Sequence, residues 1–151
     1  MTDSIFILGN FDSESNHADV LEAKLASLHT EFNFQTFSRL YKDGQSFVAS
    51  TCKQGQRLSS FVHYGDVDFG EIETFVSVFT PTSVEPEVYI LLKQLETTAF
   101  VPMRVKHIVR CVSICPDFEL IPVSRLNSVC FKLCINGTEF VSKPLNRFEL
   151  E

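Results

Sequence analysis

The sequence predicts a mainly β protein, a single small antiparallel barrel built as a meander, with one N-terminal α-helix. Its clearest local pattern is at the C-terminal end, where residues 129–135 alternate apolar and other side chains before Asn136-Gly137. This dipeptide is typical of a tight hairpin, because a type I′ turn needs positive φ at both central positions. Turn signals recur every eight to twelve residues or so, as in small all-β domains. The fifteen Phe and absence of Trp agree, since Phe favours half-buried pleated surfaces.

Length and charge divide the chain into two parts. The 151 residues fit one domain with a substantial core. The formal charge is -6, and residues 1–31 hold six acidic residues and one basic residue. We therefore predict an acidic N-terminal arm over residues 1–31, with a helix at about 16–29, and a β-rich barrel domain over 32–151. That second part is nearly neutral, so it lacks the broad positive field of a stand-alone DNA-binding protein.

The first elements are an apolar run and a helix. Ile5–Leu8 is either a first strand or a segment that docks on the body of the protein. Residues 13–16 include candidate N-caps, and apolar residues then recur at helical spacing. The stripe formed by Leu21, Leu25 and Leu28 needs a partner surface, either this domain's own sheet or another chain.

After Thr30 the pattern changes to that of strands. Residues 71–79 alternate as in a half-buried antiparallel strand, and residues 88–92 are apolar on both faces, as in a central strand. Asp43-Gly44 and Pro116-Asp117 are expected to be breaks between strands. Further strands are expected in the remaining alternating or β-branched runs, at residues 32–36, 46–51, 58–64, 105–114 and 118–123.

The five cysteines predict neither a metal nor a disulfide framework. Cys111 and Cys115 are four residues apart within an expected strand, as are Cys130 and Cys134. That spacing separates the two thiols by roughly 13 Å, too far to chelate one ion. We expect buried, reduced cysteines, no metal and no cofactor. With no basic segment at the N-terminus and no apolar run of membrane-spanning length, we expect a nuclear or cytoplasmic protein, not secreted and without a membrane partner.

Two groups of residues are candidates for ligand binding. Tyr64, Asp66, Asp68 and Phe69 resemble an aromatic and acidic pocket for a methylated ammonium, held by cation–π attraction. The same residues also fit turn formers beside core aromatics. A basic stripe suited to phosphate contact, or to a solvated strand face, is formed by Arg104, Lys106 and Arg110.

Catalysis has weaker support in the sequence. His63 and Cys52 are the residue types of a base and a nucleophile, but no recognised catalytic turn positions either of them. Ordinary strand residues are the simpler interpretation.

Several short motifs carry a resemblance to a known family. The segment 64–72 is similar to a unit made of an exposed strand, a turn and the motif F/Y-G-x-I. The C-terminal part of the chain resembles the C-terminal part of a β-rich domain, and the resemblance lies in segments 120–124, 130–131, 140–142 and 144–149. This C-terminal, BAH-like domain follows the transposase core in transposon-derived animal proteins. The resemblance covers about residues 40–149 and implies an accessory or interaction domain of a nuclear protein. No transposase carboxylate triad can be placed here, and the acidic arm has no counterpart.

These observations together predict a non-enzymatic protein-interaction module that is chromatin-associated or derived from a transposase accessory domain. A protein is the expected partner. The first alternative is a nucleic-acid-binding domain that uses the basic strand face. The second is an enzyme of unrecognised type.

Overall fold

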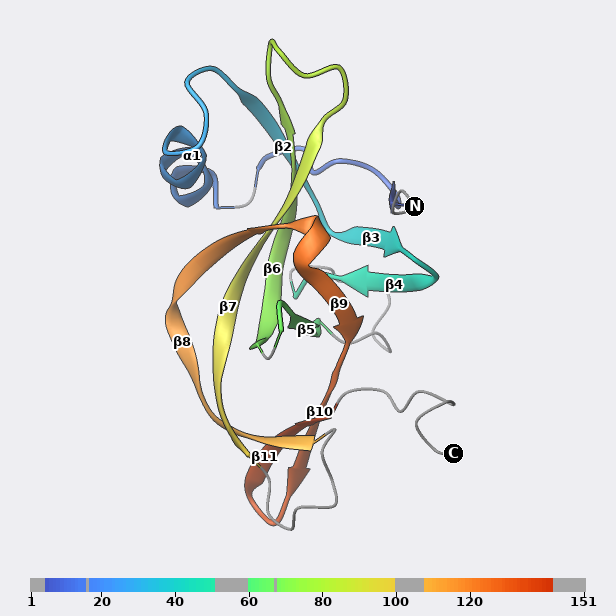
Figure 1. The fold of residues 1–151 in the computed structure, drawn as a ribbon, viewed down its shortest axis with the longest axis vertical. Coiled ribbons are helices and arrows are strands. Elements are labelled where there is room, and N and C mark those ends of the chain that lie inside the picture. The colour runs from blue at the N-terminus through green and yellow to red at the C-terminus, as the bar shows by residue number, and fades with distance from the viewer. Residues whose placement is uncertain (1–4, 16, 51–59, 67, 100–107, 143–151) are drawn as a thin grey trace.

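The computed structural model describes residues 5–15, 17–50, 60–66, 68–99 and 108–142. They form a mainly β protein with one α-helix, α1 (Ala18–Ala26), and a single 3₁₀ turn, η1 (Val123–Arg125) (Figure 1). The described strands are β1 (Ile5–Ile7), β2 (Asn33–Phe37), β3 (Arg39–Lys42), β4 (Gln45–Val48), β5 (Phe61–Tyr64), β6 (Asp68–Phe79), β7 (Glu87–Ala99), β8 (Ile108–Pro122), β9 (Leu126–Val129), β10 (Phe131–Ile135) and β11 (Thr138–Ser142).

The described strands form two antiparallel sheets. The smaller sheet has the order β1-β3-β4. The larger has eight strands in the order β10-β11-β8-β7-β6-β5-β9, and β2 pairs with the C-terminal half of β6. Lys42 Nζ donates to the Leu126 carbonyl at 2.5 Å, and this bond ties the small sheet to β9. Figure 1 shows α1 and β2 at one end of the molecule and the β10–β11 hairpin at the other.

The predicted single barrel is not confirmed, because the strand pairings of the described residues do not close into one. The two ends of the larger sheet are nevertheless close in the chain. β9 and β10 are separated only by Cys130, whose N–H donates to the Phe61 carbonyl of β5 at 2.7 Å. The segment from β9 to β10 therefore contacts β5 at one end and pairs with β11 at the other.

The turns predicted at Asn136-Gly137 and Asp43-Gly44 are both present. Asn136 and Gly137 have φ of 51° and 80°, and they connect β10 to β11. Asp43 and Gly44, with φ of 48° and 85°, connect β3 to β4. Positive φ at both central positions is the requirement of the type I′ turn.

The predicted break at Pro116-Asp117 is wrong, because β8 is one continuous strand through Pro116. The pairing of β7 with β8 goes from Lys93↔Phe118 directly to Leu95↔Ile114, which leaves three residues of β8 opposite Gln94 alone. Proline has no N–H to donate to a ladder, and a bulge is a place where a strand tolerates it.

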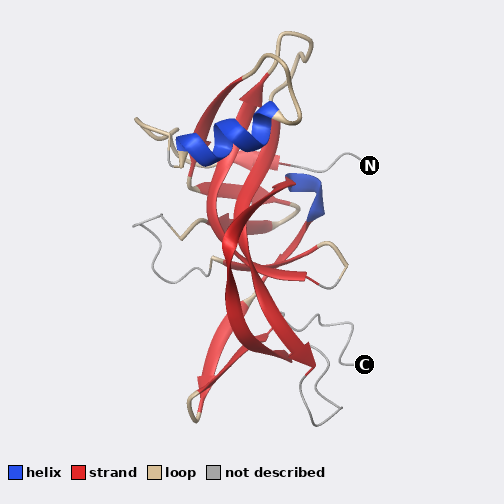
Figure 2. Cartoon of the chain, turned by 90° about the vertical axis from the view of Figure 1, so that its left-hand side faces the viewer, coloured by secondary structure: helices blue, strands red, loops and turns tan. Residues whose placement is uncertain are grey.

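α1 packs across one face of the larger sheet, near the end where β2 pairs with β6 (Figure 2). Leu21 and Leu25 of the helix are fully buried against Val76, Val78 and Leu91. Both faces of β6 are therefore covered over residues 74–78, and the prediction of a half-buried strand is wrong there. Among the described residues, no helix has the length and apolar character needed to cross a membrane.

Two further apolar clusters lie along the sheet. The central cluster contains the small sheet and the middle of the long strands, including Leu40, Phe47, Tyr64, Phe75 and Ile90. The lower cluster, toward the β10–β11 end, consists of Phe69, Leu95, Cys111, Cys130 and Val141. The long strands β6, β7 and β8 contribute to all three clusters and so connect them.

Candidate functional site

The helix stripe does not form an exposed binding surface. Leu21 and Leu25 have no solvent-exposed area, whereas the Leu28 side chain is 56% exposed. The sequence left two possible partner surfaces for the stripe, the domain's own sheet or another chain. In the structure Leu21 and Leu25 pack against the domain's own sheet. Because this core would be lost if α1 left the sheet, Leu21 and Leu25 are structural residues, and only Leu28 is accessible to another protein.

Histidines hold both ends of α1 to the sheet. His17 precedes the helix with a φ of 56°, and its Nε2 lies 2.8 Å from Glu73 Oε1 on β6. His29 Nε2 lies 3.4 Å from Glu87 Oε2 on β7 and 3.4 Å from the Tyr89 hydroxyl. Burial and the hydrogen bond to Glu87 raise the pKa of Tyr89 to about 12, so this hydroxyl remains a donor at neutral pH.

The contacts around Glu73 do not make a catalytic triad. Ser50 Oγ donates to Glu73 Oε2 at 3.3 Å, on the carboxylate that also contacts His17. In a nucleophilic triad the imidazole lies between the hydroxyl and the carboxylate, where it can take the hydroxyl proton. Here the carboxylate lies between the other two groups, so this arrangement positions the helix and does not activate Ser50.

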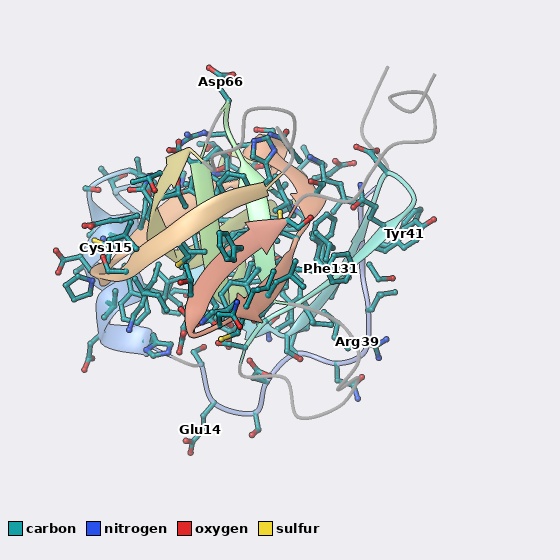
Figure 3. All side chains as sticks on the ribbon, turned by 90° about the horizontal axis from the view of Figure 1, so that it is seen from below. Glu14, Arg39, Tyr41, Asp66, Cys115 and Phe131 are labelled. Atoms are coloured by element: carbon teal, nitrogen blue, oxygen red, sulfur yellow. The ribbon has the colours of Figure 1, made fainter. Side chains whose placement is uncertain are left out.

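The aromatic and acidic residues around the β5–β6 turn are together in space but do not form an open cage. Tyr64 and Phe69 are buried, whereas Asp66 is exposed and projects outward (Figure 3). The Tyr64 ring already faces a cation, because the Arg125 guanidinium carbon lies 5.7 Å from its centroid. The place expected for a methylated ammonium is therefore occupied by the chain's own Arg125.

Arg125 is the centre of a polar network on that side. Its guanidinium lies 4.0 Å from carboxylate oxygens of both Asp68 and Glu119. Tyr64 donates its hydroxyl to Glu119 at 3.2 Å, and burial followed by the nearby Glu119 charge raises the pKa of Tyr64 far above its usual value. Gln94 Nε2 donates to Asp68 at 2.9 Å. These contacts join β6, β7, β8 and η1.

A shallow depression of about 450 Å³ lies over this network, lined by Asp66, Asp68, Arg125 and neighbouring residues. Its polar groups bond mainly within the chain: Asn127 Nδ2, for example, donates to the Gly65 carbonyl at 2.5 Å. We assign the network a structural role. Arg125, Glu119 and Gln94 were missed by sequence reasoning because they lie 25 to 60 or so positions from the turn, and only strand pairing brings them there.

Of the candidate base and nucleophile, the structure describes only His63. His63 Nε2 lies 3.2 Å from the Asp66 carbonyl oxygen, and its ring packs against Phe69 with centroids 5.1 Å apart. Cys52 lies outside the described residues. His63 is thus bound into the β5–β6 turn, as an ordinary strand residue would be.

The basic stripe is only partly visible. Arg104 and Lys106 lie outside the described residues, and Arg110 is placed by its backbone in β8, opposite Phe140 of β11 and Thr98 of β7. The phosphate-binding role of these three residues stays a prediction.

The four cysteines that the structure describes are free thiols in three environments. Cys111 and Cys130 are buried, Cys115 is half-buried and Cys134 is exposed. The expectation of buried cysteines is therefore confirmed for the first two and wrong for Cys134. Burial, with a smaller contribution from Glu139, raises the pKa of Cys111. No group of His, Cys, Asp or Glu within the described ranges has the arrangement of a metal site.

An exposed apolar row lies on β10, at one end of the larger sheet. Phe131, Leu133 and Ile135 are 49%, 38% and 54% exposed, and their spacing of two places them on the same face. Phe140 of β11 lies opposite Leu133 on that face and is largely buried. We call Phe131, Leu133 and Ile135 the β10 row.

A second surface lies at the opposite end of the molecule, beside α1. A hollow of about 720 Å³ is formed by the end of the helix region, the start of β2 and the end of β6. Phe32 and Phe34 line it as a stacked pair with centroids 6.3 Å apart, and Phe79, 39% exposed, lies at its edge. Glu22 and Glu31 are its charged residues. We call this hollow the β2 groove.

No protein-family model, curated protein or solved structure matches this chain.

Proposed function

We propose that this chain is a non-enzymatic protein-interaction module, and that its main contact surface is the β10 row. The observation that carries the proposal is this row itself. Three large apolar side chains stand side by side on one sheet face while every residue of β10 is exposed. Clustered exposed apolar residues of this kind mark protein-binding sites more often than scattered ones do.

The order of the contacts around Glu73, with its carboxylate between Ser50 and His17, supports a binding role over a catalytic one. We further propose that the partner is chromatin-associated and that the module derives from a transposase accessory domain, as its resemblance to BAH-like domains implies. In that proposal the larger sheet corresponds to the small barrel of such domains. The way in which the β9–β10 segment contacts both β5 and β11 supports this comparison.

The proposal is tested by titrating the purified protein against mononucleosomes and against DNA of the same length, each at low and physiological salt. We expect nucleosome binding that persists at physiological salt, because contacts made by apolar side chains are not screened by ions. DNA alone is expected not to bind. Equal binding to DNA and nucleosomes that collapses with salt would instead identify a nucleic-acid module using the basic strand face.

Two variants test whether the nucleosome binds at the β10 row. Replacing Phe131 and Leu133 by Thr keeps strand propensity but removes the apolar contact, so nucleosome affinity should fall tenfold or more, roughly the effect of losing interface hot spots. Val84→Thr, a matched change at a residue that is 99% exposed in the β6–β7 loop, should leave affinity unchanged. Nucleosome binding that is unaffected by the β10 double variant would contradict the proposed surface.

A further inference from the structure

The β2 groove combines aromatic walls and negative charge, and it adjoins the strand β2. Phe32, Phe34 and Phe79 supply the walls. Glu22 and Glu31 supply charge, and no Lys, Arg or His is among the described residues that line the groove. Both carboxylates belong to the acidic arm of residues 1–31.

The edge of β2 beside the groove has peptide groups that point away from the sheet. β2 pairs with β6 along one side. The Thr36 carbonyl accepts a hydrogen bond from the Asp12 N–H at 2.8 Å, so the peptide groups of Thr36 point to the other side. In a strand this direction repeats every second residue, and the N–H and carbonyl of Phe34 therefore point the same way.

The chain segment before α1 covers only the C-terminal part of this edge of β2. Asp12 bonds to Thr36, and the Leu8 N–H donates to the Arg39 carbonyl, which lies beyond the end of β2. Within the described residues, no strand pairs with β2 beside Phe34. An extended segment can therefore add to the sheet here, as peptides add to exposed sheet edges in many recognition domains.

We propose that the β2 groove binds a basic, extended peptide by strand addition to β2. Main-chain hydrogen bonds to Phe34 give the peptide its direction, and the peptide's apolar side chains on the face of Phe34 contact the Phe32 and Phe34 rings. Lys or Arg side chains of the peptide pair with Glu22 and Glu31. The inference rests on the proposed function as a protein-interaction module and adds a second surface with a defined partner chemistry.

The test uses a fluorescein-labelled peptide in which Lys and Val alternate, with fluorescence anisotropy as the readout. Wild-type protein should bind it saturably. The double charge reversal Glu22→Lys with Glu31→Lys should weaken binding about tenfold or more, because both attractive charges become repulsive. Both side chains are exposed, so the variant should fold, which far-UV circular dichroism verifies.

Three controls separate the groove from general attraction to an acidic protein. Glu14→Lys reverses a charge of the same arm outside the groove and should change the affinity by less than about twofold (Figure 3). A peptide of alternating Glu and Val should not bind. The Lys-Val peptide with an N-methylated backbone should also fail to bind, because it cannot donate to the edge of β2.

Three results would overturn the inference: no saturable binding up to roughly 1 mM peptide, equal weakening by Glu14→Lys and by the groove variant, or unchanged binding of the N-methylated peptide. The proposed function fails separately. If nucleosome binding depends on Leu133 while the peptide does not bind, only the groove is disproved. If the peptide binds but nucleosomes do not, only the chromatin partner is disproved.

Discussion

Among single residues, Gly70 occupies a tightly packed position in the larger sheet. It lies in β6 between Val62 of β5 and Gln94 of β7. A Cβ added there would lie 3.0 Å from the Lys93 carbonyl oxygen, and 3.1 Å from side-chain carbons of Leu92 and Tyr64. The absence of a side chain therefore lets the Tyr64 ring lie directly against the backbone.

Gly70→Ala should consequently destabilise the protein by roughly 1–3 kcal/mol, the usual cost of adding a methyl group to a packed core. Urea denaturation followed by circular dichroism measures this. Thr98→Ala, at an exposed position of β7, is the control and should change stability by less than about 0.5 kcal/mol. Equal effects of the two substitutions would show that the close approach at Gly70 is not rigid.

Glu71 is a residue whose charge opposes folding. Burial, and then the nearby Glu73, raise the pKa of Glu71 above its usual value. A carboxyl with a raised folded-state pKa binds its proton more tightly when folded, so its contribution to stability falls as pH rises through that range. Glu71→Gln should therefore stabilise the protein at pH 7, by ~1 kcal/mol or less because the group is only half-buried.

The same substitution should have no stabilising effect near pH 4, where the wild-type carboxyl is already largely protonated. Denaturation midpoints at both pH values test this. Glu85→Gln, in the exposed β6–β7 loop, is the control and should shift neither midpoint. A loss of stability at pH 7 would mean that the interactions of the Glu71 carboxylate with Lys132 and Ser60 stabilise the folded protein by more than the burial of its charge destabilises it.

The thiols offer a test of the catalytic alternative at the same scale. Among the described cysteines, iodoacetamide at neutral pH should label Cys134 first, because it is exposed, and Cys111 and Cys130 only when the protein unfolds. The raised pKa of Cys111 lowers its thiolate fraction further. Peptide mass spectrometry over a time course gives the order. Unusually fast labelling of Cys111 in the folded protein would favour an activated nucleophile and contradict the binding-only function.

Among elements, α1 shows that the spacing of apolar residues predicts a helix but does not predict which of those residues are buried. The spacing of Leu21, Leu25 and Leu28 correctly indicates a helix, but it does not say how wide the covered face is. The structure buries the first two residues and leaves the third 56% exposed. Leu28 also follows the end of α1 at Ala26, so it is outside the regular helix.

Leu21→Ala should therefore cost about 2–5 kcal/mol of stability, whereas Leu28→Ala should cost less than about 0.5 kcal/mol. Thermal or urea unfolding of the two variants measures the difference. Similar, small losses would mean that α1 is not held against Val76, Val78 and Leu91 as described.

The strands show why some boundaries were predictable and others were not. The hairpin turns at Asp43-Gly44 and Asn136-Gly137 depend on local backbone conformation, so the dipeptides were sufficient. The lengths of β7 and β8 depend on their mutual pairing, including the bulge that accommodates Pro116, and no local pattern indicates that. The β2 groove was invisible for the same reason, since Glu22, Phe34 and Phe79 come from separate elements.

In the whole molecule, three apolar clusters share the same long strands. β6 contributes Val78 to the cluster under α1, Phe75 to the central cluster and Phe69 to the lower one. β7 and β8 likewise enter all three clusters. Figure 1 shows β7 extending from the α1 end to the β10–β11 end, and β6 and β8 pair with it on either side. A strand cannot unfold in one cluster without losing pairing and packing in the next, so we expect the clusters to unfold together.

This coupling predicts that a substitution in the lower cluster also lowers the unfolding midpoint of the other two clusters. Val141→Ala should remove roughly 2 kcal/mol from the lower cluster. Tyr64 and Tyr89 lie in or beside the two other clusters, and the sequence has no Trp to mask tyrosine fluorescence. In urea, the variant's tyrosine fluorescence and far-UV circular dichroism should shift to the same lower midpoint.

Leu21→Ala, in the cluster under α1, should also keep the two signals coincident. An earlier dichroism transition in Val141→Ala with unchanged tyrosine fluorescence would instead show that the β10–β11 end, which carries the β10 row, unfolds independently of the rest.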